Sequence, residues 1–157
     1  MKPQIAIASK IIHVPADNIY EIIADYRTGH PLILPKPYFL SLDVEEGGIG
    51  EGTIVNFQMR LLGRTQFFRS LITEPDPGRV IVETDIRSGT PTIFRISPLA
   101  GETHTRVTLS TELVNRGAVE GLIGKWMLQK IYRAELELLA GQAEKHAALT
   151  QAATSVH

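Results

Sequence analysis

The sequence contains no cysteine, which excludes disulfide bonds, thiolate nucleophiles and cysteine-ligated metal centres. Long apolar runs are missing too, because no stretch approaches the roughly 18 residues that a membrane-spanning helix needs. The opening segment, MKPQIAIASK, lacks the apolar core of a signal peptide. We therefore expect a soluble, cytoplasmic protein without a membrane span.

Neither sign of charge is in excess, because 16 Lys and Arg and 17 Asp and Glu give a formal net charge of −1. The basic residues form no stripe that would neutralise phosphate groups, so we expect no nucleic-acid partner. With 157 residues, of which 43% are hydrophobic, the chain can bury one sizeable core. We predict a single domain over residues 1–148, a disordered tail over 149–157, and a monomer or homodimer.

Motifs of metal, cofactor and catalytic sites are also missing. The histidines show neither HxH nor HExxH spacing, and no GxSxG motif or P-loop occurs. The glycines at 47, 48, 50 and 52 lie in a predicted turn, without the strand before and helix after that a phosphate-binding loop needs. We expect no metal and no cofactor. Among the histidines, His13 at a strand end and His30 in a loop could line the mouth of a cavity.

What the sequence does contain is a series of strand-like segments bounded by Gly, Pro, Asn and Asp turn residues. A helical period from Pro15 to Asp25 and a proline-rich link over 28–37 separate the first segment from the second. The seven predicted strands are Ile5–Val14, Tyr38–Glu46, Ile54–Leu62, Thr65–Glu74, Val80–Arg87, Thr92–Ser97 and Thr105–Val114.

Alternation of polar and apolar residues predicts which side chains share a face of the sheet. Centring the hairpin turns on Gly63 and on Asp76-Pro77 segregates the two classes, which a slip of one residue would destroy. The predicted apolar face holds Val55, Phe57, Met59, Phe67, Leu71, Val82, Phe94, Ile96, Val107 and Leu109. The predicted wet face holds Asn56, Gln58, Arg60, Gln66, Ser70, Glu83, Asp85, Arg95, Arg106, Thr108 and Glu112, so Glu83 and Asp85 are expected to be solvated.

A long amphipathic helix is predicted over Gly117–Ala148, and its apolar side must be buried against the sheet. Its predicted stripe is Val119, Ile123, Met127, Ile131, Ala134 and Leu138, widened by Trp126 and Leu128.

The order of these features resembles a known family. VPADNIYEIIADY opens the first helix, GGIGEG and EPDPGRV form turns, and LELLAGQAE lies near the end of the last helix. This pattern is similar to the helix-grip domain of the START, Bet v 1 and polyketide cyclase/dehydrase (SRPBCC) superfamily. The resemblance implies an α+β fold in which a curved antiparallel sheet of about seven strands wraps around a long C-terminal helix. It also implies one or two short helices between strands one and two, and a cavity for a hydrophobic small molecule.

Arg69 is predicted on the apolar face, between Phe67 and Leu71, where a charge needs a partner. One interpretation is that Arg69 is the counter-charge for an acidic group of a ligand, with Thr84 as a neighbouring hydrogen-bond donor. The alternatives are an ion pair with an acid of the last helix, or a side chain that reaches water at an edge.

Two main functions remain open from these residues, and a protein partner bound through the exposed edge strand is a weaker third. The first is binding of a hydrophobic small molecule between sheet and helix, and an acidic one if Arg69 serves it. The second, which family precedent supports, is a cyclase or dehydratase acting on a polyketide-like chain, although the sequence offers no clear catalytic acid or base. The predicted ligand-binding residues are Phe57, Met59, Phe67, Arg69, Val82, Thr84, Phe94, Ile96, Leu109, Trp126, Met127 and Ile131.

Overall fold

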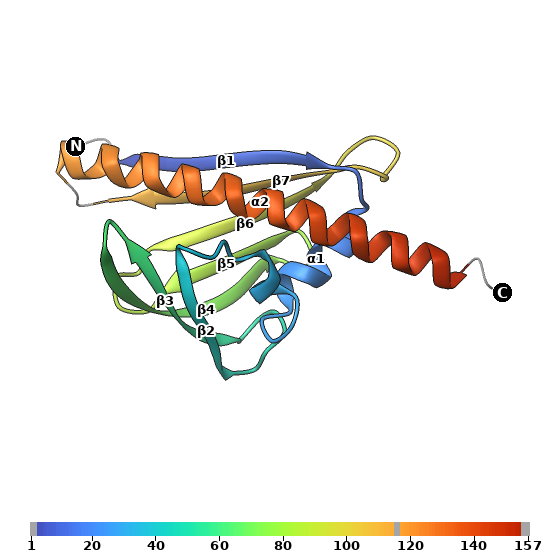
Figure 1. Ribbon diagram of the computed structural model, residues 1–157, viewed down its shortest axis with the longest axis horizontal. Helices are drawn as coiled ribbons and strands as arrows, with labels where there is room; N and C mark the ends of the chain where they lie inside the picture. Colours follow the sequence, from blue (N-terminus) through green and yellow to red (C-terminus); the bar gives the residue numbers. More distant parts are fainter. Residues whose placement is uncertain (1–2, 115–116, 155–157) are drawn as a thin grey trace.

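The computed structural model describes residues 3–114 and 117–154, and it confirms the α+β helix-grip prediction (Figure 1). None of the helices in the described part of the chain is long and apolar enough to cross a membrane. The elements are β1 (Gln4–Ile12), α1 (Ala16–Ala24), the 3₁₀ helix η1 (His30–Ile33), β2 (Phe39–Glu46), β3 (Ile54–Leu61), β4 (Arg64–Asp76), β5 (Val80–Asp85), β6 (Pro91–Pro98), β7 (Thr105–Leu113) and α2 (Ala118–Thr154).

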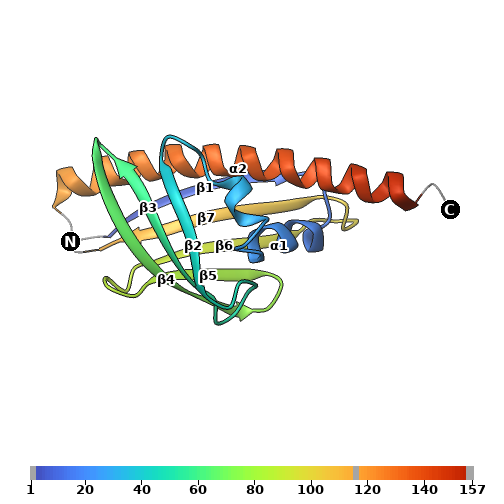
Figure 2. The same ribbon diagram turned by 60° about the horizontal axis from the view of Figure 1, so that its bottom comes forward.

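All seven strands belong to one antiparallel sheet in the order β1-β7-β6-β5-β4-β3-β2. The two chain-neighbours β1 and β2 therefore lie at opposite edges, because α1 and η1 carry the chain across the sheet. Figure 1 shows α2 running alongside β1 and β7, and Figure 2 shows β2, β3 and β4 curving away from it. The space between α2 and this curved half of the sheet is where the candidate site lies.

The glycine-rich turn between β2 and β3 is fixed against the end of α1. The Tyr26 amide donates to the Gly48 carbonyl at 2.8 Å, and the Gly50 amide donates to the Ala24 carbonyl at 3.0 Å. Gly48 has φ +143°, a conformation that residues with a side chain rarely adopt, and a Cβ atom added there would also displace the Arg27 side chain, whose Nε would lie 2.5 Å away. These hydrogen bonds between the turn and the end of α1 fix the position of Tyr26 beside the cavity.

The predicted faces are correct in β3, β6 and β7 but wrong in β4. The turn of the β3–β4 hairpin has positive φ at both Leu62 (52°) and Gly63 (76°), and Leu61 pairs with Arg64. It is thus a two-residue turn, as favoured in hairpins, and not one centred on Gly63. Met59 consequently pairs with Gln66 and not with Phe67. The one-residue slip moves Phe67, Arg69 and Leu71 to the outer face of the sheet.

The one-residue error in register also reverses the predicted faces of β5, but the faces of β6 are again correct. Leu71 pairs with Thr84 where Val82 was predicted, so Val82 and Thr84 point outward with Leu71. In the next hairpin Phe94 pairs with Ile81, which the predicted apolar face did not include, so Phe94 itself is on the predicted face. Ile81, Glu83 and Asp85 therefore face the helix side of the sheet.

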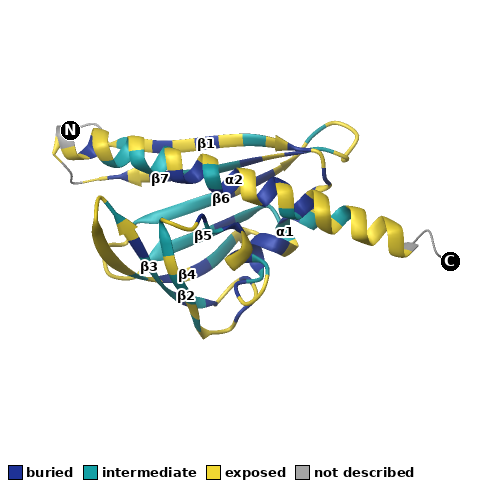
Figure 3. Ribbon diagram, in the orientation of Figure 1, coloured by how far each residue is buried: buried dark blue, intermediate teal, exposed yellow. Residues whose placement is uncertain are grey.

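The buried core lies where α1 and the second half of α2 cover the sheet (Figure 3). Ile131 is fully buried, as predicted, but Leu138 and Trp126 are 39% and 60% exposed. The helix instead buries Tyr132, Glu135, Leu136, Leu139, Ala140 and Ala143. The prediction chose one apolar stripe and left out Glu135, whose charge made it look like a surface residue; the side chain of Val119 lies outside the described set.

α2 also extends beyond its predicted end at Ala148, to Thr154. The added segment, LTQAAT, contains no Gly or Pro and is rich in Ala, the residue with the highest helix propensity.

Candidate ligand-binding cavity

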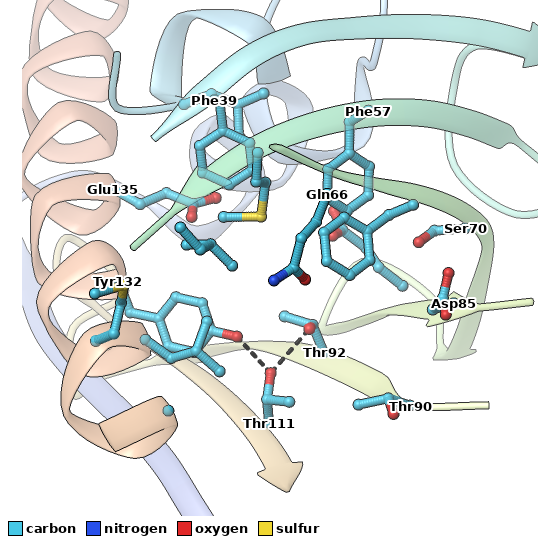
Figure 4. A pocket seen from close by; sticks show the side chains of 18 of the residues that line it. Phe39, Phe57, Gln66, Ser70, Asp85, Thr90, Thr92, Thr111, Tyr132 and Glu135 are labelled. Carbon is cyan, nitrogen blue, oxygen red and sulfur yellow. Dashed lines mark hydrogen bonds between the residues drawn. The ribbon is translucent and has the colours of Figure 1, made fainter. Parts of the chain in front are cut away.

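A cavity of about 720 Å³ lies between the sheet and α2 (Figure 4). Its volume falls within the range of roughly 300–1,000 Å³ that is usual for small-molecule sites. The first half of α2 contributes Ile123, Gly124, Met127 and Leu128 to its lining, and the curved strands contribute the opposite wall. The cavity predicted between sheet and helix is therefore present.

One wall of the cavity is aromatic. The rings of Phe57 and Phe68 stack with centroids 5.0 Å apart, and the rings of Phe39 and Phe57 lie 6.0 Å apart. Met59 and Met127 also line the space, and their flexible thioethers adapt to irregular shapes. Such a wall favours a flat apolar ligand, because offset ring stacking adds to the burial of apolar area.

A chain of hydroxyl groups lines the cavity below this wall. Thr92 Oγ1 lies 2.8 Å from Thr111 Oγ1, and Thr111 in turn hydrogen-bonds the hydroxyl of Tyr132 (Figure 4). Burial raises the pKa of Tyr132 to about 12, so its hydroxyl remains protonated at neutral pH. The chain provides both donors and acceptors to a polar group of a ligand.

The side chains of Tyr26, His30 and Glu83 form a second polar cluster. The Tyr26 hydroxyl donates to Glu83 Oε1 at 2.7 Å, and His30 Nε2 lies 3.4 Å from the same oxygen. His30 Nδ1 lies 2.7 Å from the carbonyl oxygen of Ile23, so Nδ1 must carry a proton and donate it. Nε2 can then hydrogen-bond Glu83 only if one proton lies on Nε2 or on the Glu83 carboxyl. Burial first, and the charge of Glu83 second, raise the pKa of Tyr26 well above its usual value.

Glu135 presents a carboxyl group from α2 into the same space (Figure 4). The residue is only 4% exposed, and its carboxyl has no hydrogen-bond or ion-pair partner among the described residues. Burial raises the pKa of Glu135 well above its usual value, and the charge of Glu83 raises it further. Of the four acidic residues of the described lining, Glu83 accepts a hydrogen bond from Tyr26, whereas Glu135 has no partner in the described part of the protein.

Residues 5–144 match the profile of a family described as polyketide cyclase/dehydrase and lipid transport. The chain belongs to this family. The resemblance inferred from the sequence is thereby confirmed. A comparison with curated proteins gave no match to this family member.

Solved structures share the fold of this polyketide cyclase/dehydrase family member at low sequence identity. The solution structure of KanY protein has a TM-score of 0.80 and 23% identity, over 92% of this chain and 99% of that one. The Zhui aromatase/cyclase from Streptomyces sp. R1128 has a TM-score of 0.73 and 17% identity, over 93% and 96%. Norcoclaurine synthase from Thalictrum flavum, solved with dopamine and hydroxybenzaldehyde, has a TM-score of 0.67 and 15% identity, over 92% and 88%.

The structure brings together only part of the predicted site. Phe57, Met59, Phe94 and Met127 line the cavity. Ile96, Leu109 and Ile131 are buried in the core but do not line it. Four others, Phe67, Arg69, Val82 and Thr84, lie on the outer face of the sheet because of the hairpin slip, and Trp126 lies on the exposed side of α2.

Arg69 has a partner that the prediction did not consider. Its guanidinium makes two hydrogen bonds to Glu45 of β2, from Nε at 2.8 Å and from Nη2 at 2.9 Å. Asn56 donates to the same carboxylate at 2.9 Å. The pKa of Glu45 falls to about 2 because of the Arg69 and Asn56 hydrogen bonds. The placement of Arg69 in the cavity is therefore wrong, and its pair is an exposed cross-strand contact.

Several residues that line the cavity were missed by sequence reasoning. Glu83 and Asp85 were placed on the wet face, a direct result of the hairpin slip. By contrast, His30 was expected at the mouth of a cavity and does line it, although it is almost fully buried against Tyr26, with ring centroids 4.3 Å apart. A signal for Glu135 was present in its spacing: it lies four residues after Ile131 and four before Leu139, on the buried side of the helix. Among the described residues, no group of three or more His, Asp or Glu could hold a metal ion.

Proposed function

We propose that the protein binds a hydrophobic small molecule in the cavity between the sheet and α2. The observation that carries the proposal is an apolar cavity of about 720 Å³ whose aromatic wall, Phe39, Phe57 and Phe68, is not filled by the helix. A solid core would have closed this space, because protein interiors are normally packed without voids larger than a water molecule. Membership of a cyclase/dehydrase and lipid transport family supports the same function.

The expectation of an acidic ligand loses its basis. It rested on Arg69 inside the cavity, and Arg69 is bound to Glu45 on the outer face. Arg64 contributes the one guanidinium of the described lining, and it is exposed at the tip of the β3–β4 hairpin. The ligand that we propose is therefore a largely apolar molecule, and no acidic group is expected on it.

Two neighbouring residues of β4 provide a matched test. The side chain of Gln66 points into the cavity (Figure 4), whereas that of Thr65 alternates to the outer face, and both residues are exposed. We expect the uncharged fluorescent probe Nile red to bind the native protein. Gln66→Trp should fill the cavity mouth and weaken binding by about tenfold or more. Thr65→Trp should leave it unchanged. Equal affinity in the two variants, with circular dichroism showing both folded, would contradict the proposal.

A second candidate function is a cyclase or dehydratase, and a specific observation favours it. The cavity holds Glu135 with a raised pKa beside Glu83 and His30, which are residue types suited to general acid–base catalysis. In dehydration of a β-hydroxy ketone, Glu83 would take the α-proton while protonated Glu135 would protonate the leaving hydroxyl. A carbon–carbon double bond forms and water leaves.

Loss of water from a β-hydroxy aryl ketone, followed by mass spectrometry, tests this candidate. We expect product formation by the native protein and its loss in Glu135→Gln, with Glu144→Gln as an exposed control on α2. Nile red binding without turnover would support the binding function and contradict the enzymatic one.

A further inference from the structure

Glu135 is the one buried carboxyl of the described residues that projects into the cavity without a partner. Glu83 is also part of the lining, but Tyr26 donates to it and His30 lies against it. An unpaired carboxyl in an apolar space costs free energy in the empty protein, because nothing replaces the water that its oxygens have lost. The unpaired carboxyl group of Glu135 therefore points to a ligand group that donates hydrogen bonds to its oxygens.

The charge of the lining indicates the sign of that group. The described lining carries four acidic side chains, Glu83, Asp85, Glu120 and Glu135, and a single guanidinium, that of Arg64. No lysine belongs to it. Around Glu135 the titratable neighbours are Glu83 of β5, Tyr132 of its own helix and Tyr26 after α1, none of which supplies a positive charge. His30 of η1 is the other basic residue of the described lining besides Arg64, and it lies against Glu83.

We propose that the bound molecule carries a basic nitrogen, and that Glu135 and Glu83 accept hydrogen bonds from its protonated form. This proposal rests on the proposed binding function and specifies the polar end of its ligand. The aromatic wall formed by Phe39, Phe57 and Phe68 takes the apolar body. An aryl ring joined by a short chain to an amine combines the two features, and neither part of the cavity offers a counter-charge to a carboxylate.

Binding of a cation has a consequence for protons. In the empty cavity burial and Glu83 raise the pKa of Glu135, which favours its protonated form. A neighbouring ammonium group favours the carboxylate, so the pKa of Glu135 falls on binding. An amine that arrives as an ammonium ion should therefore release a proton from the protein, and its affinity should rise with pH until Glu135 is ionised without ligand.

Three ligands of one shape test the proposal by displacement of Nile red near neutral pH: naphthylethylamine, naphthylethanol and naphthylacetic acid. We expect the amine to bind about tenfold tighter than the alcohol, the usual effect of a buried charged hydrogen bond, and the acid to bind weakest. Glu135→Gln should reduce the affinity for the amine to that for the alcohol and leave the alcohol unchanged. Glu144→Gln, on the exposed side of α2, should retain the preference.

A calorimetric readout separates charge recognition from a change in fold. Titration of the amine in two buffers of different protonation enthalpy should show proton release with the native protein and none with Glu135→Gln. Equal affinity for amine and alcohol, or a preference that survives in Glu135→Gln, overturns the proposal while Nile red binding still supports the cavity as a ligand site. If neither Nile red nor any of the three ligands binds, the proposed function fails together with the inference.

Discussion

At the scale of single residues, Glu135 lies at a helix position that is buried against the core, but its carboxyl group is costly to bury there. Its neighbours one turn away on either side, Ile131 and Leu139, are fully buried, so the backbone carries Glu135 to the inside of the helix. A glutamine would fit the same space without a charge to bury. The need for an apolar core does not explain why a carboxyl group lies at this site.

Replacing Glu135 with Gln should raise the free energy of unfolding, and by more at about pH 8 than at about pH 5. Burial and the charge of Glu83 raise the pKa of Glu135 in the folded protein, so the unfolded chain loses this proton at a lower pH. Between the unfolded and the folded pKa, each pH unit costs the folded protein up to about 1.4 kcal/mol. Urea denaturation across this pH range measures the difference, with Glu144→Gln as the control. A difference that does not change with pH would show that Glu135 ionises normally.

At the scale of elements, the β3–β4 hairpin decides which side chains reach the cavity. Its turn places Leu62 at φ 52°, a left-handed conformation that is uncommon for a residue other than Gly, Asn or Asp. Nothing in the amino-acid sequence signals this, because Asn-Gly and not Leu-Gly is the usual pair for such a turn. A pattern of alternation gives the strand but not its pairing register.

Leu62→Asn should therefore stabilise the protein by about 1 kcal/mol, since Asn adopts the left-handed conformation at lower cost. The Leu62 side chain is largely exposed, so little buried area is lost. Thermal unfolding compares the variant with Leu40→Asn, which replaces an exposed leucine in the extended strand β2. A loss of stability in Leu62→Asn as large as in Leu40→Asn would contradict this account of the turn.

How much the sequence could predict differs from element to element. The alternation in Ile54–Leu62 correctly placed Phe57 and Met59, because period-two patterns report the buried face of a strand directly. Arg69 and Glu83 were misplaced because their faces depended on the turn between two strands, a tertiary feature with a weak local signal. The fold survived these errors because it follows from element order and from the long helix. The candidate site was predicted only in part, because the side chains that β4 and β5 contribute to it depend on register.

At the scale of the whole molecule, packing and cavity occupy different parts of one helix. Between Ile131 and Ala143 one side of α2 is buried against the core, whereas Ile123 and Met127 face the cavity. The two halves should respond differently to the same substitution. Ile131→Asp should cost several kcal/mol, because it places a charge where the side chain is fully buried.

Ile123→Asp is the matched control in the half of α2 that lines the cavity, where Ile123 is 45% exposed. We expect it to cost well under half as much stability but to weaken Nile red binding, since Ile123 lines the cavity. Denaturant unfolding and probe titration of both variants give the comparison. Equal destabilisation would mean that both halves of α2 belong to one core.

The glycine-rich turn that docks on α1 has a consequence for how such a protein can diversify. It ties the β2–β3 end of the sheet to α1 through backbone hydrogen bonds, such as that from the Gly50 amide to the Ala24 carbonyl, which involve none of the side chains of the aromatic wall. Substitutions among Phe39, Phe57 and Phe68 can then alter the aromatic wall while this attachment persists. Ligand preference can drift from one descendant to the next at little risk to folding, so relatives with the same backbone need not share a ligand.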